Sequence, residues 1–497
     1  MEKTDLPAEG SDIQRGKAVR VASTIGILCI AWLILWRMKL RWSSAEEFLW
    51  VTILYTLCSI PSVLFSAGHK SRIPFMPMWG LAYFMMFGVP MLSEEEQLHL
   101  SFVPESAVMS ALGMAALGAM ACLLTFYTFL GKWLEGWIPR LRAPWDPRRA
   151  PRIGVLLTSV GIVLHYIQRT SSPSLVWSQI LYVLSQLGVV GMLTLFLAQL
   201  RGLLSLRLRL FLWVFAVPVE LLMALGSGAM YNAILILTPF LFCYTVERRT
   251  IPWLWLILTA AFLVPFLGLK HEYRSYAWYG EEGGDIVITA SPIQRGLAFI
   301  QLVIRRLSDG AVETYTVAAE TTQARVSHLG VLITVMETTP KIVPFWGGET
   351  YRTLLWALAP RILFPNKPVK SLGQEFGHRY GLLGEEDSLT AFNLPHQVVE
   401  MYINFGPLGV LIGMGIIGLC YRAVLTLMDH PNAGERSIII GCGLLSNLLD
   451  LDSDFSLVFG GVVYYVAVMY VVSRSLTASP GTSAPMASTE THPSPNR

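Results

Sequence analysis

Long apolar runs separated by short polar segments dominate this chain of 497 residues. A helix that crosses a bilayer needs about 20 mostly apolar residues, and twelve runs reach or approach that length. The eleventh is short and ends near Asp450. The predicted spans are 21–36, 47–66, 74–91, 106–131, 153–168, 174–200, 210–225, 229–246, 251–269, 402–426, 437–449 and 456–473. The pattern predicts an all-α polytopic membrane protein.

The apolar runs divide the chain into four regions. Residues 1–269 are predicted to form an N-terminal transmembrane bundle of about nine spans. Residues 270–401 contain no convincing span and form one large loop, and residues 402–474 return to transmembrane helices. Residues 475–497 are rich in serine, threonine and proline, which cannot bury a core, and they are predicted to be a disordered tail.

Composition agrees with this pattern and excludes several classes of function. Hydrophobic residues make up 53% of the chain and charged residues only 14%, whereas soluble domains carry about 25% charged residues. The net charge of +3 and the absence of a basic, aromatic-rich cluster argue against a nucleic-acid partner. The six cysteines lie in apolar runs without metal-ligand spacing, so neither a metal nor a disulfide is predicted. No nucleotide-binding or serine-hydrolase motif is present.

Lysine and arginine are distributed unevenly between the short loops, and this asymmetry predicts the orientation. If the N-terminus is cytoplasmic, the cytoplasmic segments hold 20 of these residues and the outer short loops hold 4. The exception is the basic segment 37–41, whose long side chains can reach lipid head groups. Both termini are therefore predicted to be cytoplasmic, with the large loop on the outer face.

Polar chemistry is concentrated in the large loop. It contains 12 of the 37 lysines and arginines, 14 of the 34 acidic residues and 4 of the 9 histidines. Residues 294–307 are predicted to form an amphipathic helix on the membrane surface. Further helices are predicted at 330–345, broken at Pro340, and at 352–364, ending near Pro360, because proline cannot continue a helix. Such helices could form the rim of a lipid-facing cavity.

A stiff cationic segment, "PRILFPNKPVKS", follows the third of these helices. Its prolines restrict the backbone around Arg361 and Lys367. Arginine binds phosphate oxygens in a bidentate way and lysine acts as a point charge, so the segment could hold a diphosphate. It could also be an interfacial loop that anchors to lipid head groups.

Two stretches resemble Wzy-type O-antigen and exopolysaccharide repeat-unit polymerases. The first, "GGETYRTLLWALAPRILFPNKP", is similar to the outer-loop signature of that family, and "EMYINFGPLGVLIG" is similar to the segment that re-enters the membrane. The matching positions are Gly348, Tyr351, Pro360, Arg361, Lys367, Pro368, Glu400, Asn404, Phe405, Gly406 and Gly409. Some family members carry an Arg-x10-Gly motif, which residues 270–401 lack, because the spacing from Arg361 to Gly373 is one residue longer.

The resemblance implies a glycosyltransferase similar to the metal-independent GT-C class, in the bacterial inner membrane. A growing glycan would pass from undecaprenyl diphosphate to the non-reducing end of a new lipid-linked repeat unit at the outer leaflet. The implied partners are the lipid-linked donor and acceptor and membrane lipid. A chain-length regulator and a flippase of the same pathway are further candidate partners. No cofactor or metal is implied.

This reaction needs cations for the departing diphosphate and a base for the acceptor hydroxyl. The leading cations are Arg361 and Lys367. Further candidates for binding diphosphate or glycan are Arg379, Arg325, Arg352, Arg274, Tyr351, His378 and Asn404. The leading catalytic groups besides Arg361 are His396 and Glu400, four residues apart and thus on one helix face. His378 is the reserve base.

Each candidate also has a structural interpretation. His396 could cap or hydrogen-bond the loop, and Glu400 could stabilise a helix N-terminus through the dipole. Arg379 could pair with Glu375, and Asn404 could only allow close helix packing.

Two acidic features lie outside the loop. Glu220 falls inside a predicted span, where an acid is a functional candidate or hydrogen-bonds a neighbouring helix. Asp450, Asp452 and Asp454 could hold a hard cation or form a plain acidic turn.

Two other functions remain open. An O-antigen ligase would use the same donor with a different acceptor. A lipid-linked oligosaccharide transporter or flippase is a different class, for which repeats and several membrane-embedded charges are typical, and the sequence shows neither.

Overall fold

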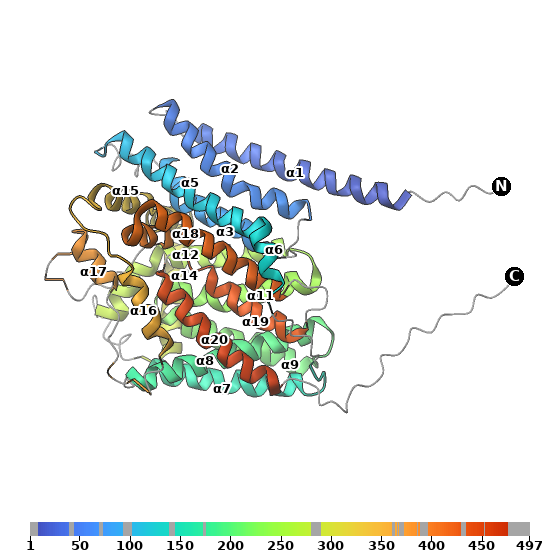
Figure 1. The fold of residues 1–497 in the computed structure, drawn as a ribbon. Helices are drawn as coiled ribbons and strands as arrows, with labels where there is room; N and C mark the ends of the chain where they lie inside the picture. The colour runs from blue at the N-terminus through green and yellow to red at the C-terminus, as the bar shows by residue number, and fades with distance from the viewer. Residues whose placement is uncertain are drawn as a thin grey trace, which may run out of the picture.

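The structure is a computed structural model in which every regular element of the described residues is a helix (Figure 1). The described residues are 8–38, 44–68, 73–92, 102–138, 145–171, 175–279, 290–359, 363–364, 366, 372–384, 386–387, 396–428, 434–451 and 453–475. The predicted tail therefore lies almost entirely outside them.

The first half of the chain forms the elements α1 (Ala8–Met38), α2 (Ala45–Ser66), α3 (Phe75–Phe87), η1 (Val89–Leu92), α5 (Glu105–Tyr127), α6 (Phe129–Glu135), α7 (Ala150–Thr170), α8 (Leu175–Leu200), α9 (Leu206–Leu210), η2 (Phe211–Ala216), α10 (Val217–Gly226), α11 (Met230–Arg248) and α12 (Trp253–Tyr279). The second half forms α14 (Pro292–Val326), α15 (Leu329–Thr338), α16 (Glu349–Leu358), α17 (Leu372–Arg379), α18 (Gln397–Met428), α19 (Glu435–Leu448) and α20 (Phe455–Ser475).

Nine helical segments of the described residues are long and apolar enough to cross a membrane. They correspond to nine of the twelve predicted spans, so the membrane-protein class is confirmed and the count of twelve is not. The other three predicted spans fall on α3, α19 and α20. The third has 21 residues, but the first two have only 13 and 14. A helix of that length reaches only about 20 Å, less than the apolar thickness of a bilayer.

The helices run back and forth between two ends of the bundle. We call the end that carries α15, α16 and α17 the loop end (left in Figure 1). The helices α7, α10, α12 and α19 end there, whereas α8, α11, α18 and α20 begin there. Residues that are remote in sequence therefore meet at the loop end whenever they lie next to one of these termini.

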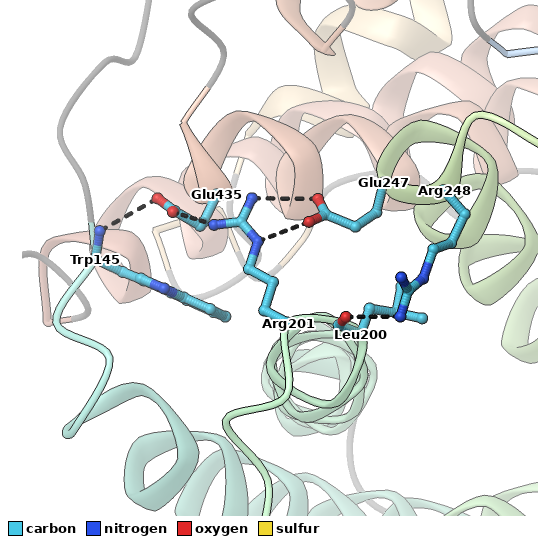
Figure 2. Close-up of polar contacts among 6 residues, drawn as sticks. All are labelled: Trp145, Leu200, Arg201, Glu247, Arg248 and Glu435. Carbon is cyan, nitrogen blue, oxygen red and sulfur yellow. Dashed lines mark hydrogen bonds and ion pairs between the residues drawn. The ribbon is translucent and has the colours of Figure 1, made fainter. Parts of the chain in front are cut away.

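An ion-pair cluster ties the helices together at the opposite end (Figure 2). The guanidinium of Arg201 donates to both carboxylate oxygens of Glu247, at 3.0 and 3.2 Å, and pairs with Glu435. Glu435 also accepts from the backbone N–H of Trp145, at 3.3 Å. The cluster joins the ends of α8 and α11 to the start of α19 and to the segment before α7. These ion pairs hold the helix termini together at the opposite end of the bundle. The loop end differs from it, because it carries the additional short helices α15, α16 and α17.

The large loop is helical and partly belongs to the bundle. Helices are confirmed at all three predicted places, where α14 continues to Val326, α15 ends before Pro340 and α16 ends at Leu358. The first two do not lie only on the membrane surface but pack against helices of the bundle. Helix α14 packs on α10 and α12, and α15 packs on α5 and α18. Moreover, α12 runs on to Tyr279 and α18 starts at Gln397, so the loop is shorter than residues 270–401.

A sharp break at Gly406 divides α18 into two arms. Gly406 has φ 63° and ψ −150°, a conformation open almost only to glycine. The chain turns back so far that a Cβ on Gly409 would collide with the carbonyl of Met401. The arm 407–428 starts with proline, which suits the first helical position, and is about 33 Å long. The arm 397–405 lies at the loop end, folded against the long arm.

Candidate functional site

Asn404 joins the short arm of α18 to the start of α16. Its Oδ1 accepts from the backbone N–H of Gly348 at 2.9 Å. Its Nδ2 donates to the Thr350 hydroxyl at 2.9 Å and to the Glu400 carbonyl at 2.7 Å. The side chain is 1% exposed, so these bonds are shielded from water. Asn404 is thus more than a small packing residue, because it uses both ends of its amide to position two segments.

Glu400 extends this connection to α20. One carboxylate oxygen accepts from the backbone N–H of Phe455, the first residue of α20, at 2.6 Å. The Ser456 hydroxyl donates to the carbonyl of Thr350 at 3.1 Å. Glu400 also lies in the first turn of its own helix, so its charge faces the positive ends of two helix dipoles. Glu400 therefore lies where the dipole interpretation requires it, at the starts of two helices, and its dipole role stays a prediction.

We call this hydrogen-bonded unit of Gly348, Thr350, Glu400, Asn404 and Phe455 the junction. It brings together the two stretches that carry the sequence resemblance, through bonded pairs that are 54 and 56 residues apart in the chain. The ring of Tyr351 stacks on Phe405, with centroids 6.1 Å apart, and meets Phe455 edge-on at 5.8 Å. Burial raises the pKa of Tyr351 above its ordinary value, so its hydroxyl stays protonated. Tyr351 is thus a candidate hydrogen-bond donor.

An apolar groove of about 880 Å³ begins at the junction. Both arms of α18 line it, together with α16, the segment before α16 and the first residue of α20. Its walls include Phe405, Leu408, Ile412 and Ile416, each of which is about half exposed or more. Asn404 and Tyr351 are among its few polar side chains. The groove therefore suits a long hydrocarbon with a polar group at one end.

His396 lies just before α18 in a closed aromatic surrounding. It is 1% exposed, and its ring meets Phe87 edge-on with centroids 4.8 Å apart. Its Nδ1 accepts from the backbone N–H of Val398 at 3.0 Å, while Nε2 has no hydrogen-bond partner among the described residues. Burial, and next the neighbouring His328, lower its pKa well below the ordinary value. The capping interpretation is confirmed, and a catalytic role for His396 stays a prediction.

Arg379, the last residue of α17, lies beside the junction. Its guanidinium pairs with Glu349 at 3.2 Å and with Glu375, as predicted. It also stacks on the ring of Trp346, with 4.1 Å from Cζ to the ring centroid. The side chain remains 36% exposed, so an anion could reach it from solvent. The neighbouring His378 has no hydrogen-bond partner for Nδ1 among the described residues.

Of the remaining predicted cations, only Arg352 and Arg274 have described side chains. Arg361 and Lys367 lie outside the described residues, as do the prolines at 360, 365 and 368. The side chain of Arg325 is not described either, and Arg352 is exposed on α16. Arg274 donates to the carbonyl of Gly228 at 3.0 Å, at the turn between α10 and α11. The predicted diphosphate site around Arg361 therefore stays a prediction.

The structure also places two ionisable residues that sequence reasoning missed, His165 and Arg169, beside Glu220. Glu220 is 3% exposed and pairs with His165 of α7, at 2.6 Å between Oε2 and Nδ1. Arg169, one turn further along α7, donates its Nε to His165 Nε2 at 3.2 Å. The i, i+4 spacing of the histidine and arginine was visible in the sequence, but their contact with α10 was not. The hydrogen-bonding interpretation of Glu220 is confirmed.

No group of three metal-ligating side chains occurs in the described part of the chain. One of the three predicted acidic positions, Asp452, is not described.

Taken together, the fold and the site define a helical membrane-embedded protein with a polar junction and an apolar groove at one end of its bundle. Residues 149–479 match the protein family described as a domain of unknown function, DUF8712. The match covers more than half of the chain, so the protein belongs to the DUF8712 family. The matched region contains α7 to α20 and therefore both the junction and the Glu220 pair. No curated protein and no solved structure matches the chain.

Proposed function

We propose that this protein is a glycosyltransferase that polymerises oligosaccharide repeat units carried on undecaprenyl diphosphate. The bond between the donor's anomeric carbon and the diphosphate breaks, and a bond to the acceptor's hydroxyl oxygen forms. The hydroxyl proton passes to a base, and the lipid diphosphate leaves with the bonding electrons. The loop end would face the outside of the inner membrane, as the distribution of lysine and arginine predicts.

The observation that carries this proposal is the apolar groove that begins at the junction. A polyprenyl chain is a long hydrocarbon, and its burial against Leu408, Ile412 and Ile416 is favourable in proportion to the apolar area covered. Its diphosphate would then lie at the end of the groove, near Asn404 and Tyr351. The resemblance to Wzy-type polymerases concerns the same two stretches that form this junction.

The proposed chemistry also needs positive charge at the departing diphosphate, because negative charge develops there in the transition state. Arg361 and Lys367 follow α16 in the chain and are the leading candidates. Arg379 is a described cation with a partly exposed guanidinium, and its partner Glu349 lies between Gly348 and Thr350 of the junction. Its two carboxylate partners would have to yield one hydrogen-bonding edge to the phosphate.

Deletion of the gene in its own host tests the proposal against the ligase alternative. A polymerase mutant keeps single repeat units on the cell surface and loses the longer chains. A ligase mutant loses all attached glycan, and that result would refute polymerisation. The surface glycan is measured by gel electrophoresis of extracted material.

Filling the groove tests the lipid site separately. Leu408→Trp places a large side chain where the groove is widest open to lipid, because Leu408 is 68% exposed. We expect extension of lipid-linked units to fall about tenfold, which is ~1.4 kcal/mol of binding energy. Val214→Trp is the matched control, because Val214 is 70% exposed on a different helix. Equal activity of both variants would remove the groove from the proposal.

One observation favours transport as a second candidate function. Paired ionisable residues inside a membrane bundle are typical of proton-coupled transporters, and Glu220 and His165 form such a pair. A transporter would move the lipid-linked oligosaccharide across the membrane without lengthening it.

A further inference from the structure

A second cavity lies inside the bundle, between α7, α8, α10, α11, α19 and α20, and its volume is about 130 Å³. It is built from the parts of these helices that lie toward the loop end. His165 and Arg169 belong to the last turns of α7, Tyr231 to the first turn of α11, and Asn447 to the last turn of α19. The cavity is separate from the apolar groove, which has none of these residues in its walls.

The hydrogen bonds in the charged wall of the cavity determine which ring nitrogen of His165 carries the proton. Arginine only donates, so His165 Nε2, which receives the Arg169 Nε–H, must carry a lone pair. The proton of the neutral imidazole is then on Nδ1 and is donated to Glu220. The three groups together are a carboxylate, a neutral imidazole and a guanidinium without net charge. Such balanced pairing is what allows charges to persist inside a bundle.

Close packing of two helices sets the position of the carboxylate. A Cβ on Gly188 of α8 would come within 3.3 Å of Glu220 Oε1. The glycine therefore leaves the carboxylate the space that it occupies between α7 and α8. The charged wall is a built feature of the helix crossing and not a chance contact of long side chains.

The remaining wall offers neutral hydrogen-bonding groups. It is formed by hydroxyl and amide side chains, among them Tyr182, Gln186, Tyr231, Asn232, Asn447 and Tyr465. The hydroxyl of Tyr465, which is 4% exposed, has no hydrogen-bond partner among the described residues. A buried polar group without a partner destabilises the fold, so a ligand or water that bonds to it would be stabilising.

We propose that this cavity binds one sugar residue of the lipid-linked oligosaccharide, a claim that rests on the proposed function. A sugar ring is neutral and presents hydroxyl groups on several sides, which match amides, tyrosine hydroxyls and a carboxylate. Its volume is close to the ~150 Å³ of a protein cavity that encloses one benzene molecule, so it has room for about one six-membered ring. Its polarity and size exclude a polyprenyl chain. Asp450 lies beside the lining residues Tyr182 and Tyr231, so the cavity offers a diphosphate no net attraction.

The test measures binding and chain extension on the same full-length protein in nanodiscs. The probe is the repeat-unit oligosaccharide, released by mild acid from the host's lipid-linked pool, and binding is followed by saturation-transfer NMR. Tyr465→Phe removes only the buried hydroxyl, and Gln186→Ala removes one amide. We expect each to weaken binding about tenfold, the effect of one hydrogen bond to a ligand. The matched control is Tyr470→Phe, because Tyr470 lies on the same helix but is 49% exposed.

The outcomes separate this site from the proposed function. Equal binding by Tyr465→Phe, Gln186→Ala and wild type, or no binding by wild type, would overturn the sugar site. If wild type binds with the expected dependence but never extends lipid-linked units, the site stands and polymerisation is refuted. If wild type extends them and both cavity variants bind and extend equally well, polymerisation stands and the site is refuted. Thermal unfolding of each variant shows whether a loss of binding reflects misfolding.

Discussion

From the hydrogen bonds of Asn404 we predict how much its side chain contributes to the free energy of unfolding. In Asn404→Ala, the Gly348 N–H, the Thr350 hydroxyl and the Glu400 carbonyl each lose their hydrogen bond to the Asn404 amide. Hydrogen bonds between membrane helices average about 0.6 kcal/mol, so three of them give a lower value of about 2 kcal/mol. Buried groups left without partners raise the cost, to about 4 kcal/mol. We expect Asn404→Ala to lower the free energy of unfolding by about 2–4 kcal/mol.

Equilibrium unfolding of the purified protein in mixed detergent micelles, followed by circular dichroism, measures this change. The control is Asn447→Ala, because the amide of Asn447 makes one bond within its own helix, to the Gly443 carbonyl at 2.8 Å. That variant should lose no more than about 1 kcal/mol. If Asn404→Ala is no less stable than Asn447→Ala, the amide does not hold the junction together.

Three further predictions concern neighbouring features. Gly406→Ala forces an alanine into a conformation that costs roughly 1–3 kcal/mol, whereas Gly384→Ala, with open space around it, should leave the unfolding midpoint unchanged. His396 is protonated below about pH 6.5 in the unfolded chain but not in the folded one, so stability should fall by up to ~1.4 kcal/mol for each pH unit below that value. His396→Gln should flatten this dependence in unfolding measured from pH 7.5 to 5, and an unchanged slope would show that another group titrates. Arg379→Ala removes exposed ion pairs and should cost less than about 1 kcal/mol of stability, yet reduce chain extension at least tenfold if Arg379 contacts the diphosphate. Wild-type extension rates in that variant would exclude the contact.

The helices of this fold were largely predictable, because apolar runs of the right length allow few other structures in a membrane. The three loop helices followed from apolar residues at helical spacing, and proline explains why α15 ends at Thr338 and α16 at Leu358. The break at Gly406 did not, because a glycine followed by proline also suits close helix packing. Only the backbone angles of Gly406 and the fold-back of Met401 onto Gly409 show which of these roles the sequence serves.

The site was predictable in part. Asn404, Glu400 and Tyr351 were singled out from the resemblance, and they do meet at one place. Their bonding partners lie about 50 residues away in the chain, a separation that no local pattern reports. The same holds for Glu220 and His165, which are 55 residues apart.

Chain extension by the purified protein is the direct test of whether it polymerises lipid-linked repeat units. The full chain is reconstituted in vesicles with undecaprenyl-diphosphate-linked repeat units, and glycan length is followed by gel electrophoresis. We expect a ladder of longer glycans with wild type and a strong loss of these longer glycans with Arg361→Ala. Movement of the lipid-linked unit across the vesicle membrane without any lengthening would contradict polymerisation and favour transport.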